Sequence, residues 1–588
     1  MIYFKYITNT QKINSYMKKI ALLLISGLML TSCSDLLDTE PYDQFTKDNF
    51  FTSEKNVELF ANYFYNEFSG YGNSGSYGDY YFNFLNDDQG TTGIQPWTFT
   101  AVPASAGSWN SPYTEIRRAN TLIEALPGIG EMTDAAKKNY EGLARLYRAW
   151  QHFKLVRGFG DCYWVDKVLD ITDADILYGP RHSRNTVMDN VLADLNYACQ
   201  NIIMNEDSRV AYNKYVALAI KSRVCLFEGT YSKYVLGDDN RANTFLTEAK
   251  NASAEIMNSS KYVLNSDFKK NFDQMDLANN KEMIMYKHYV YGVLGHATVD
   301  YTCGSTQVHG ITKDAFDSYL FLDGKPKATT TLDKSEGGKI ISFDDNSGFG
   351  VQDFINMADV MKRRDPRMIA QVDTILQFPG CGYARFGGAQ STSSTGYGVL
   401  LFDTNAMPNT DRQSIGTNST DAPIFWLAEI LLNYAEACAE LGSITDNDLN
   451  ISINLLRDRV GMPHLTTAVE ADPANNMGVS NIIWEIRRER RVELMYCNND
   501  RYYSLQRWNK LELLDTQKHV DQCRGAYVGN LLGTGNIDWN QIDVDADGYI
   551  NCKNKGTERI YEDKYNLFPI PSGQSSLNPE IGQNPGWN

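Results

Sequence analysis

The residues best suited to chemistry lie in a polar stretch that carries no helical period. Asp87, Asp88 and Gln89 precede Trp97, which follows Pro96. A flat indole face can cover the C–H face of a sugar ring, while carboxylates bind its hydroxyl groups. We therefore predict Trp97, Asp87 and Asp88 as ligand-binding candidates. The alternative for Trp97, a loop anchor packed on the core, carries equal weight.

Two further loop-like stretches hold the same kinds of side chain. Tyr301 stands beside Asp300, and Tyr383 and Arg385 lie in the glycine-rich run 380–385. These three residues complete the predicted ligand-binding set. The alternative for each is an ordinary solvated loop residue.

Catalytic signatures are scarce. The chain has no Gly-x-Ser-x-Gly elbow and no His-Glu-x-x-His pair, and its seven histidines are scattered. A Gly-x-Gly-x-x-Gly run at 70–75 follows a predicted helix, whereas a dinucleotide cradle needs a strand before it and a helix after it. Adjacent carboxylates such as Asp87 and Asp88 could serve a glycosidase, but 72 acidic residues produce such pairs by chance. We predict that the chain is not an enzyme.

One run resembles part of a metal site. Asp543, Asp545 and Asp547, followed by glycine, match the first half of a calcium-binding loop. The twelfth position of that loop holds Asn554 in place of a bidentate glutamate. A β-hairpin with an Asp-Gly turn is therefore the favoured interpretation. Weak structural calcium binding stays open as the alternative, and no other metal or cofactor is expected.

Amphipathic helices must position these loops, and we predict a mainly α fold. Small and large apolar residues alternate within 215–234, as they do in the paired helices of tetratricopeptide repeats. The scaffold is thus predicted to consist of degenerate tetratricopeptide-like helical hairpins with long irregular loops and minor β-hairpins. Apolar residues recur at helical spacing in 57–68, 113–126, 135–156, 187–203, 215–234, 243–256, 425–441, 451–460 and 482–496.

Long polar, glycine-rich stretches separate these helices, at roughly 69–111, 286–351 and 378–423. Loops of this length inside a folded chain are usually functional or disordered. We interpret them as an irregular surface built on the helical platform. Cys303 and Cys381 lie in two of these loops and could pair, although sequence does not fix a disulfide.

The N-terminus carries the features of an export signal. Lys18 and Lys19 precede an apolar run over 20–30, which is too short to span a bilayer as a helix. Leu-Thr-Ser-Cys then ends at Cys33 and resembles a lipoprotein box. We predict a signal peptide over 1–32, with Met17 as an alternative start, and lipidation of Cys33.

The net charge of −17 points away from nucleic acid as a partner, because like charges repel. It also argues mildly against strongly anionic ligands. No second apolar stretch of membrane-spanning length occurs. The lipid is therefore the membrane attachment that we expect.

A series of blocks occurs in a fixed order along the chain. The first block contains Trp109, which we expect in the core. The blocks are Ile-Arg-Arg-Ala-Asn at 116–120, Ala-Arg-Leu-Tyr-Arg-Ala at 144–149, Leu-Val-Arg-Gly-Phe-Gly-Asp at 155–161, Arg-Asp-Pro-Arg at 364–367, Asn-Tyr-Ala-Glu-Ala at 433–437, Ile-Arg-Arg-Glu-Arg-Arg-Val-Glu-Leu at 486–494 and Leu-Phe-Pro-Ile-Pro at 567–571. Over nearly the whole mature chain this set resembles the SusD/RagB family of glycan-binding lipoproteins.

The resemblance implies a SusD-like domain over 33–588, with an N-terminal part at about 33–235 and a C-terminal RagB/SusD part at about 280–588. It also implies a lipid-anchored protein on the cell surface at the outer membrane. Such a protein captures oligosaccharides and delivers them to a SusC-like TonB-dependent transporter. A peptide-binding lid of the same transporter type is the alternative, and a surface glycoside hydrolase is a weaker one.

The block at 486–494 also predicts local ion pairs. On one helix, Glu485 precedes Arg488 by three residues, and Arg490 precedes Glu493 by three. Pairs at this spacing stabilise a helix by about 0.2–0.5 kcal/mol each. We expect both pairs to form.

Overall fold

The computed structural model describes residues 50–80, 85–90, 96–303, 309–344, 351–381, 383, 385, 392–497, 500–552 and 558–587. The predicted signal peptide and Cys33 lie outside these residues. Within them the predicted mainly helical fold is confirmed. The N-terminal helices are α3 (Glu54–Ala61), α4 (Gly107–Ala125), α5 (Asp134–Phe159), α6 (Ala174–Leu177), α7 (Arg184–Asn201), α8 (Lys214–Tyr231) and α9 (Asp239–Asn258).

The C-terminal half alternates short helices with irregular chain. Its helices are α10 (Thr298–Cys303), α11 (Lys313–Ser318), α12 (Ala358–Met361), α13 (Arg367–Gln371), α14 (Asn409–Arg412), α15 (Leu427–Glu440), α16 (Asp446–Asn450), α17 (Ile453–Val460), α18 (Asn481–Glu493), α19 (Asp500–Arg507) and α20 (Ser572–Leu577). Single helical turns of 3₁₀ type occur in both halves, and a π-helical turn, η4 (Ser232–Leu236), follows α8.

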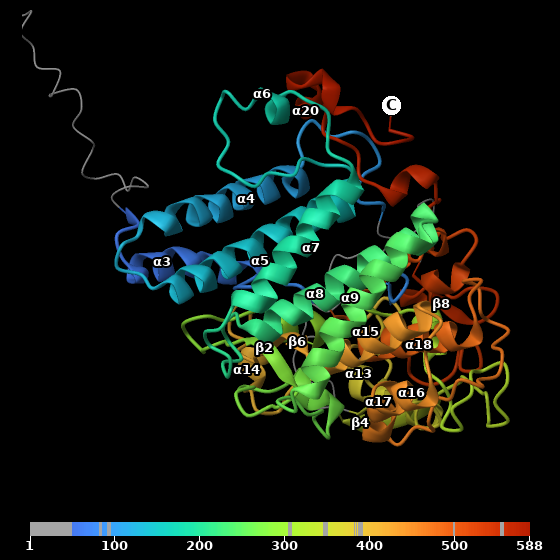
Figure 1. Cartoon of the computed structure of the whole chain (residues 1–588). Coiled ribbons are helices and arrows are strands. Elements are labelled where there is room, and N and C mark those ends of the chain that lie inside the picture. The colour runs from blue at the N-terminus through green and yellow to red at the C-terminus, as the bar shows by residue number, and fades with distance from the viewer. Residues whose placement is uncertain are drawn as a thin grey trace, which may run out of the picture.

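Successive long helices pack side by side, α4 on α5, α5 on α7, α7 on α8 and α8 on α9 (Figure 1). Contacts from α9 to α15 and from α15 to α18 carry this array into the C-terminal half. Gly229 of α8 permits the approach of α9, because a Cβ atom there would lie 2.7 Å from Cγ of Leu246. This contact of a small residue with a large one agrees with the tetratricopeptide-like packing predicted for 215–234.

Local signals set the ends of these helices. The Thr133 hydroxyl accepts a hydrogen bond from the Ala136 N–H at 3.1 Å and caps α5. That helix ends at Gly160, whose φ of 73° suits glycine. Asn213 caps α8 by accepting from two N–H groups of its first turn, at 2.9 and 3.1 Å. Loss of such a cap typically lowers stability by about 1 kcal/mol. The capping residues therefore help to determine where these helices begin.

The strands form small two-stranded antiparallel sheets in the part of the chain that the structure describes. Two of the four pairs join segments more than 100 residues apart in the sequence and so tie the loops to the helical platform. The pairs are β1 (Gln89–Gly90) with β3 (Gly310–Ile311), β2 (Met283–Lys287) with β6 (Ala422–Trp426), β4 (Lys339–Asp344) with β5 (Val351–Asn356), and β7 (Arg524–Tyr527) with β8 (Tyr549–Asn551).

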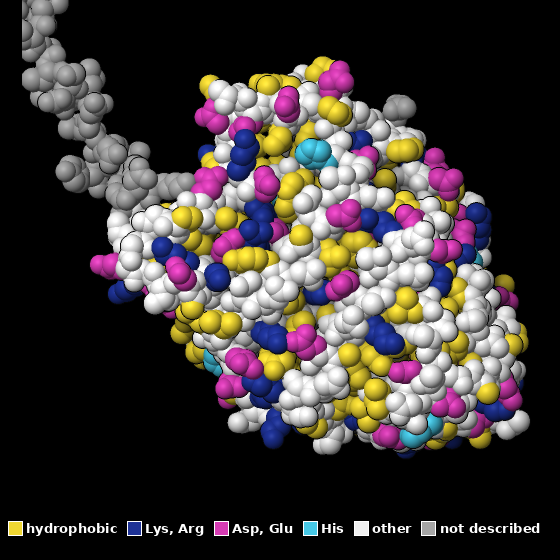
Figure 2. Space-filling view, viewed as in Figure 1, with side chains coloured by type: hydrophobic (Ala, Val, Ile, Leu, Met, Phe, Trp, Pro, Cys, Tyr) yellow, Lys and Arg dark blue, Asp and Glu magenta, His cyan; other side chains and the backbone are white. Residues whose placement is uncertain are grey.

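One large apolar core runs through both halves of the chain. It includes Trp109, which is 2% exposed and lies inside α4, as expected for a scaffold residue. A smaller second core gathers Trp97, Trp508 and leucines of the segment 505–514. Charges of both signs are mixed with apolar side chains on the face shown in Figure 2.

The charged residues of helix α18 are buried, and one of the two ion pairs predicted within this helix is replaced by contacts with other elements. The predicted pair of Arg488 with Glu485 is present, with Nε 3.2 Å from the carboxylate. The predicted pair of Arg490 with Glu493 is wrong. The Glu493 carboxylate instead accepts from Arg367 at 2.9 Å. Arginines buried against other helices reach carboxylates across the core rather than neighbours one turn away.

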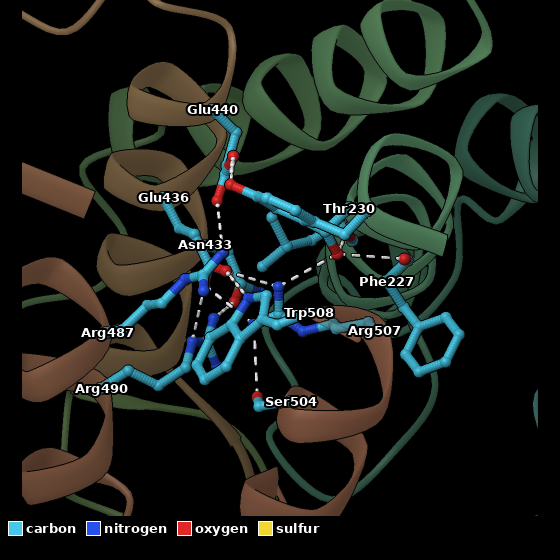
Figure 3. Close-up of polar contacts among 12 residues, drawn as sticks. Phe227, Thr230, Asn433, Glu436, Glu440, Arg487, Arg490, Ser504, Arg507 and Trp508 are labelled. Atoms are coloured by element: carbon cyan, nitrogen blue, oxygen red, sulfur yellow. Dashed lines mark hydrogen bonds and ion pairs between the residues drawn. The ribbon is translucent and has the colours of Figure 1, made fainter. Parts of the chain in front are cut away.

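Two glutamates of α15 bind two arginines of α18 and one of α19. Figure 3 shows Glu436 and Glu440 facing Arg487 and Arg490 of α18 and Arg507 of α19. The Glu436 carboxylate accepts from Arg490 Nε and from Arg507 Nη2, both at 2.9 Å. This network fastens α15, α18 and α19 to one another.

Two remaining expectations concern membranes and thiols. None of the described helices is both long and apolar enough to span a bilayer. Cys303 and Cys381 are both buried, and their thiols contact separate carbonyl groups, that of Val399 at 3.2 Å and that of Leu376 at 3.5 Å. The disulfide that the sequence left open between them is therefore not formed.

Candidate functional site

Trp97 is an anchor and not an exposed platform. Its side chain is only 6% exposed, and its ring stacks on Tyr565 with the centroids 4.5 Å apart and the planes 6° apart. Its Nε1 donates to the Ile560 carbonyl at 2.8 Å. Because a neighbouring ring covers its face, the indole is not available to a sugar. These contacts favour the alternative of a packed loop anchor, and ligand binding by Trp97 stays a prediction.

Asp87 and Asp88 are buried counter-ions. Arg501 binds the Asp87 carboxylate through two hydrogen bonds of 2.7 and 2.6 Å, and Arg491 Nε binds Asp88 at 2.6 Å. Burial alone would raise the pKa of Asp87, but Arg491 and Arg501 outweigh it and hold the pKa well below its usual range. Asn86 turns the chain here by accepting from the backbone N–H of Asp88 at 3.0 Å. These contacts favour a structural role over binding of sugar hydroxyls.

Tyr383 and Arg385 also make interior contacts. Arg385 donates to the Asp373 carboxylate from Nη2 at 2.6 Å and from Nε at 3.1 Å. The Tyr383 ring meets Phe354 edge to face, with the centroids 5.5 Å apart. Both side chains therefore support the loop, and the structure does not bring them to the other predicted ligand residues that it describes.

Tyr301 is the predicted residue that stays partly accessible on an aromatic surface. It lies in α10, and its hydroxyl donates to the Gly75 carbonyl at 2.9 Å. Its ring lies beside that of Tyr77, with the centroids 5.0 Å apart. Tyr77 is 50% exposed. We call Tyr77 and Tyr301 the tyrosine pair.

A tight glycine-rich turn places Tyr77 against Tyr301. Gly72 has a φ of 91°, and a Cβ atom there would lie 2.3 Å from the Ser76 carbonyl oxygen, so only glycine fits. The Ser74 N–H donates to the Gly295 carbonyl at 2.8 Å and fastens the turn to the second loop. The Gly-x-Gly-x-x-Gly run therefore shapes a surface turn, in agreement with its rejection as a dinucleotide cradle.

The surroundings of the tyrosine pair are mixed apolar and polar. Ile415, 54% exposed, reaches the same turn, because a Cβ on Gly75 would lie 3.0 Å from its Cγ2. Asn73, Ser74 and Ser76 are exposed on the turn. Aromatic faces rimmed by amide and hydroxyl groups can bind the two sides of a sugar, its C–H face and its hydroxyls. Sequence reasoning missed Tyr77, although an aromatic residue between glycines and serines was a usable signal.

A charged cavity of about 120 Å³ lies between α11, α18 and α19. Trp484, Arg491 and Arg501 line it, and Asp87 reaches it from the N-terminal loop. A cavity of about 150 Å³ is the size that holds one benzene ring. This space can therefore take one ring at most, and its arginines already have carboxylate partners. It is a poor place for an oligosaccharide.

The acidic run at 543–547 forms a turn that is closed by an arginine. Arg524 of β7 binds Asp545 at 2.6 Å and Asp547 at 2.5 Å. Asp543 instead accepts from the Asn551 side chain at 2.9 Å. Val544 pairs with Ile550 across the turn, as the favoured hairpin interpretation predicts. A guanidinium thus neutralises two of the three carboxylates, and the described residues hold no group of three or more metal-ligating side chains.

Two family models match the chain. That of the SusD family covers residues 265–587, and a second, described as "Starch-binding associating with outer membrane", covers residues 35–226. A SusD-like protein of Bacteroides ovatus is 24% identical over 287 residues, which is 46% of this chain and 50% of that protein. The chain thus spans about half the length of this curated relative.

Solved structures share the fold. A SusD-like carbohydrate binding protein of Bacteroides fragilis superposes with a TM-score of 0.66 at 21% identity, covering 91% of this chain and 100% of that one. A laminarin binding SusD-like protein superposes with a TM-score of 0.54 at 19% identity, covering 91% and 100%. At these identities the likeness shows the fold.

Proposed function

This chain belongs to the SusD family, whose model matches more than half of its length, and from that premise we propose that it captures oligosaccharides at the cell surface. The proteins of this family are binding proteins and not enzymes. Two relatives of the same fold carry names that describe carbohydrate binding, one of them laminarin binding. Those names support a glycan as the cargo of this chain.

The tyrosine pair is the observation that carries the proposal. It joins two loops that are far apart in the sequence, and it leaves aromatic surface in contact with water. Several weak stacking and hydrogen-bonding contacts suit a protein that must release its ligand after capture. A neutral glycan fits this surface better than a strongly anionic one, given the net charge of −17.

The attachment and the partner belong to the same proposal. Residues 1–32 would be removed as a signal peptide, and Cys33 would carry the lipid that holds the protein at the outer membrane. The mature domain, 33–588, would combine an N-terminal part at about 33–235 with a C-terminal part at about 280–588. It would pass its ligand to a SusC-like TonB-dependent transporter. The family description "associating with outer membrane" supports this location.

Replacing Tyr301 with Ala is expected to weaken glycan binding about tenfold, because loss of one aromatic contact removes roughly 1–1.5 kcal/mol. Tyr77→Ala should have an effect of similar size. Calorimetric titration of the purified protein with a panel of neutral oligosaccharides measures both. Tyr178→Ala is the matched control, since Tyr178 is 60% exposed and lies just after α6, away from the tyrosine pair.

A peptide panel titrated alongside the oligosaccharides makes three results informative. Binding that falls in both tyrosine variants and stays intact in the control supports the proposed surface. Equal glycan affinity in all variants would show that the binding site lies elsewhere on the molecule. Peptide binding without glycan binding would overturn the cargo and favour a peptide-binding lid.

A further inference from the structure

A small cavity lies where α5, α8, α15 and α19 converge. Its volume is about 50 Å³. Four arginines line it, together with apolar side chains that include Trp426 of β6. The arginines are Arg157, Arg223, Arg490 and Arg507. Since a single water needs about 10–15 Å³ of such space, the cavity has room for a few waters or one small ion.

Three carboxylates neutralise three of these arginines. Glu429 accepts two hydrogen bonds from Arg223, of 2.6 and 2.7 Å. Glu436 binds Arg490 and Arg507, as Figure 3 shows. Asp500 adds a second carboxylate to Arg490 at 2.9 Å. One guanidinium charge at the cavity is left over.

Arg157 carries the surplus charge. No carboxylate pairs with it within the described part of the chain. Its Cζ instead lies 3.4 Å from the ring centroid of Tyr503 and 5.2 Å from that of Phe153. Arg157 sits in the last turn of α5, whose end offers only about half a negative charge. Arg157 is part-buried, and a charge partly withdrawn from water without a counter-ion is destabilising.

Trp426 also lines this cavity and carries an unsatisfied donor. Its side chain is 1% exposed, and its Nε1 is buried without an acceptor among the residues that the structure describes. A buried donor left in this state is destabilising, because it has lost its hydrogen bond to water. Arg157 lacks a counter-ion and Trp426 lacks an acceptor, and one anion held by both lining residues would supply the two together.

We propose that this cavity binds a small inorganic anion between Arg157 and the indole N–H of Trp426. The anion completes the charge balance of a junction that joins N-terminal helices α5 and α8 to C-terminal helices α15 and α19. Part of the Arg157 side chain remains accessible, which gives the ion a route from solvent. The site serves the scaffold and does not depend on the glycan proposal.

Crystals of the protein soaked in sodium bromide provide the direct test. Bromide scatters anomalously and replaces chloride or a small oxyanion. We expect an anomalous peak in the cavity within hydrogen-bonding distance of Trp426 Nε1 and beside the Arg157 guanidinium. A cavity that holds only water or stays empty under these conditions overturns the proposal.

Thermal unfolding in solution gives an independent test. At equal ionic strength, chloride or phosphate should raise the midpoint by about 2 °C over gluconate, which is too large for the cavity. Arg157→Met should abolish this difference. Arg117→Met, which removes the same charge from an exposed position on α4, should retain it. A larger shift with phosphate than with chloride supports an oxyanion as the occupant, and equal midpoints in all three salts contradict the inference.

Discussion

Replacing Glu436 with Gln will lower the free energy of unfolding by about 3–5 kcal/mol, the loss that follows removal of one partner from a buried ion pair. Glu436 is fully buried and accepts from Arg490, from Arg507 and from the indole Nε1 of Trp508, the last at 2.8 Å. Glutamine keeps the volume but not the charge. The guanidinium of Arg507 then has no carboxylate partner in the network of Figure 3.

Glu436 should also make the free energy of unfolding depend on pH. Burial alone would raise the pKa of Glu436, but Arg507 and Arg490 outweigh it and lower the pKa to about 2 from an ordinary value of 4.5. The stabilisation from Glu436 is therefore complete above pH 4.5 and is lost as the pH falls toward 2. The difference in stability between the wild type and Glu436→Gln should narrow by about 1 kcal/mol between pH 7 and pH 3.5.

Urea denaturation at both pH values measures this difference, with Asp207→Asn as the control. Asp207 also pairs with a lysine, Lys261, but its side chain is 95% exposed. Exposed pairs contribute at most about 1 kcal/mol, so this variant should unfold almost as the wild type does. A loss for Glu436→Gln no larger than that of the control would show that the network contributes nothing to stability.

Helix positions were predictable because they follow from local patterns. The predicted segment 135–156 corresponds to α5, and 215–234 corresponds to α8 with η4. Apolar spacing, a capping Thr133 and a capping Asn213 are all visible in the sequence. The helix α19 was missed because its eight residues are mostly charged or polar and its partners lie on distant elements.

Partners in the buried charge network were not predictable in the same way. The sequence places Glu485 and Arg488 one turn apart, and that pair forms. It places Arg490 and Glu493 at the same spacing, yet these residues bind other helices. Spacing along one helix cannot reveal which face is buried by α15 or by the loop before α13. A buried arginine then takes the carboxylate that the fold brings to it.

One residue of the proposed binding surface was a candidate from the sequence, and its neighbour was not, for a related reason. Tyr301 was chosen from its residue type, and the structure keeps it at an accessible surface. Its neighbour Tyr77 could not be paired with it from sequence, because only the folded turn at 70–78 brings the two rings within 5.0 Å. Residue type narrows the candidates, whereas exposure depends on contacts between distant loops.

Trp97 shows the same limit, and its replacement by Ala will cost about 3–5 kcal/mol of stability, the range for a buried Trp reduced to Ala. The substitution removes the stack on Tyr565 and leaves the Ile560 carbonyl without its indole donor. The second core around Trp508 loses one of its largest members. Chemical denaturation of the purified protein measures this loss.

Glycan affinity distinguishes a residue that only stabilises the fold from one that stacks on the ligand. At a temperature where Trp97→Ala is still folded, its affinity for an oligosaccharide should equal that of the wild type, whereas Tyr301→Ala binds more weakly and unfolds normally. Trp97→Phe is the graded control, because phenylalanine keeps an aromatic ring over Tyr565 and loses only the hydrogen bond, worth about 1–3 kcal/mol when its acceptor is left buried. If Trp97→Ala is folded but no longer binds glycan, Trp97 belongs to the binding site and the prediction is contradicted. If Trp97→Ala loses stability but keeps its glycan affinity, and Tyr301→Ala does the reverse, then Trp97 stabilises the fold and the tyrosine pair binds the glycan.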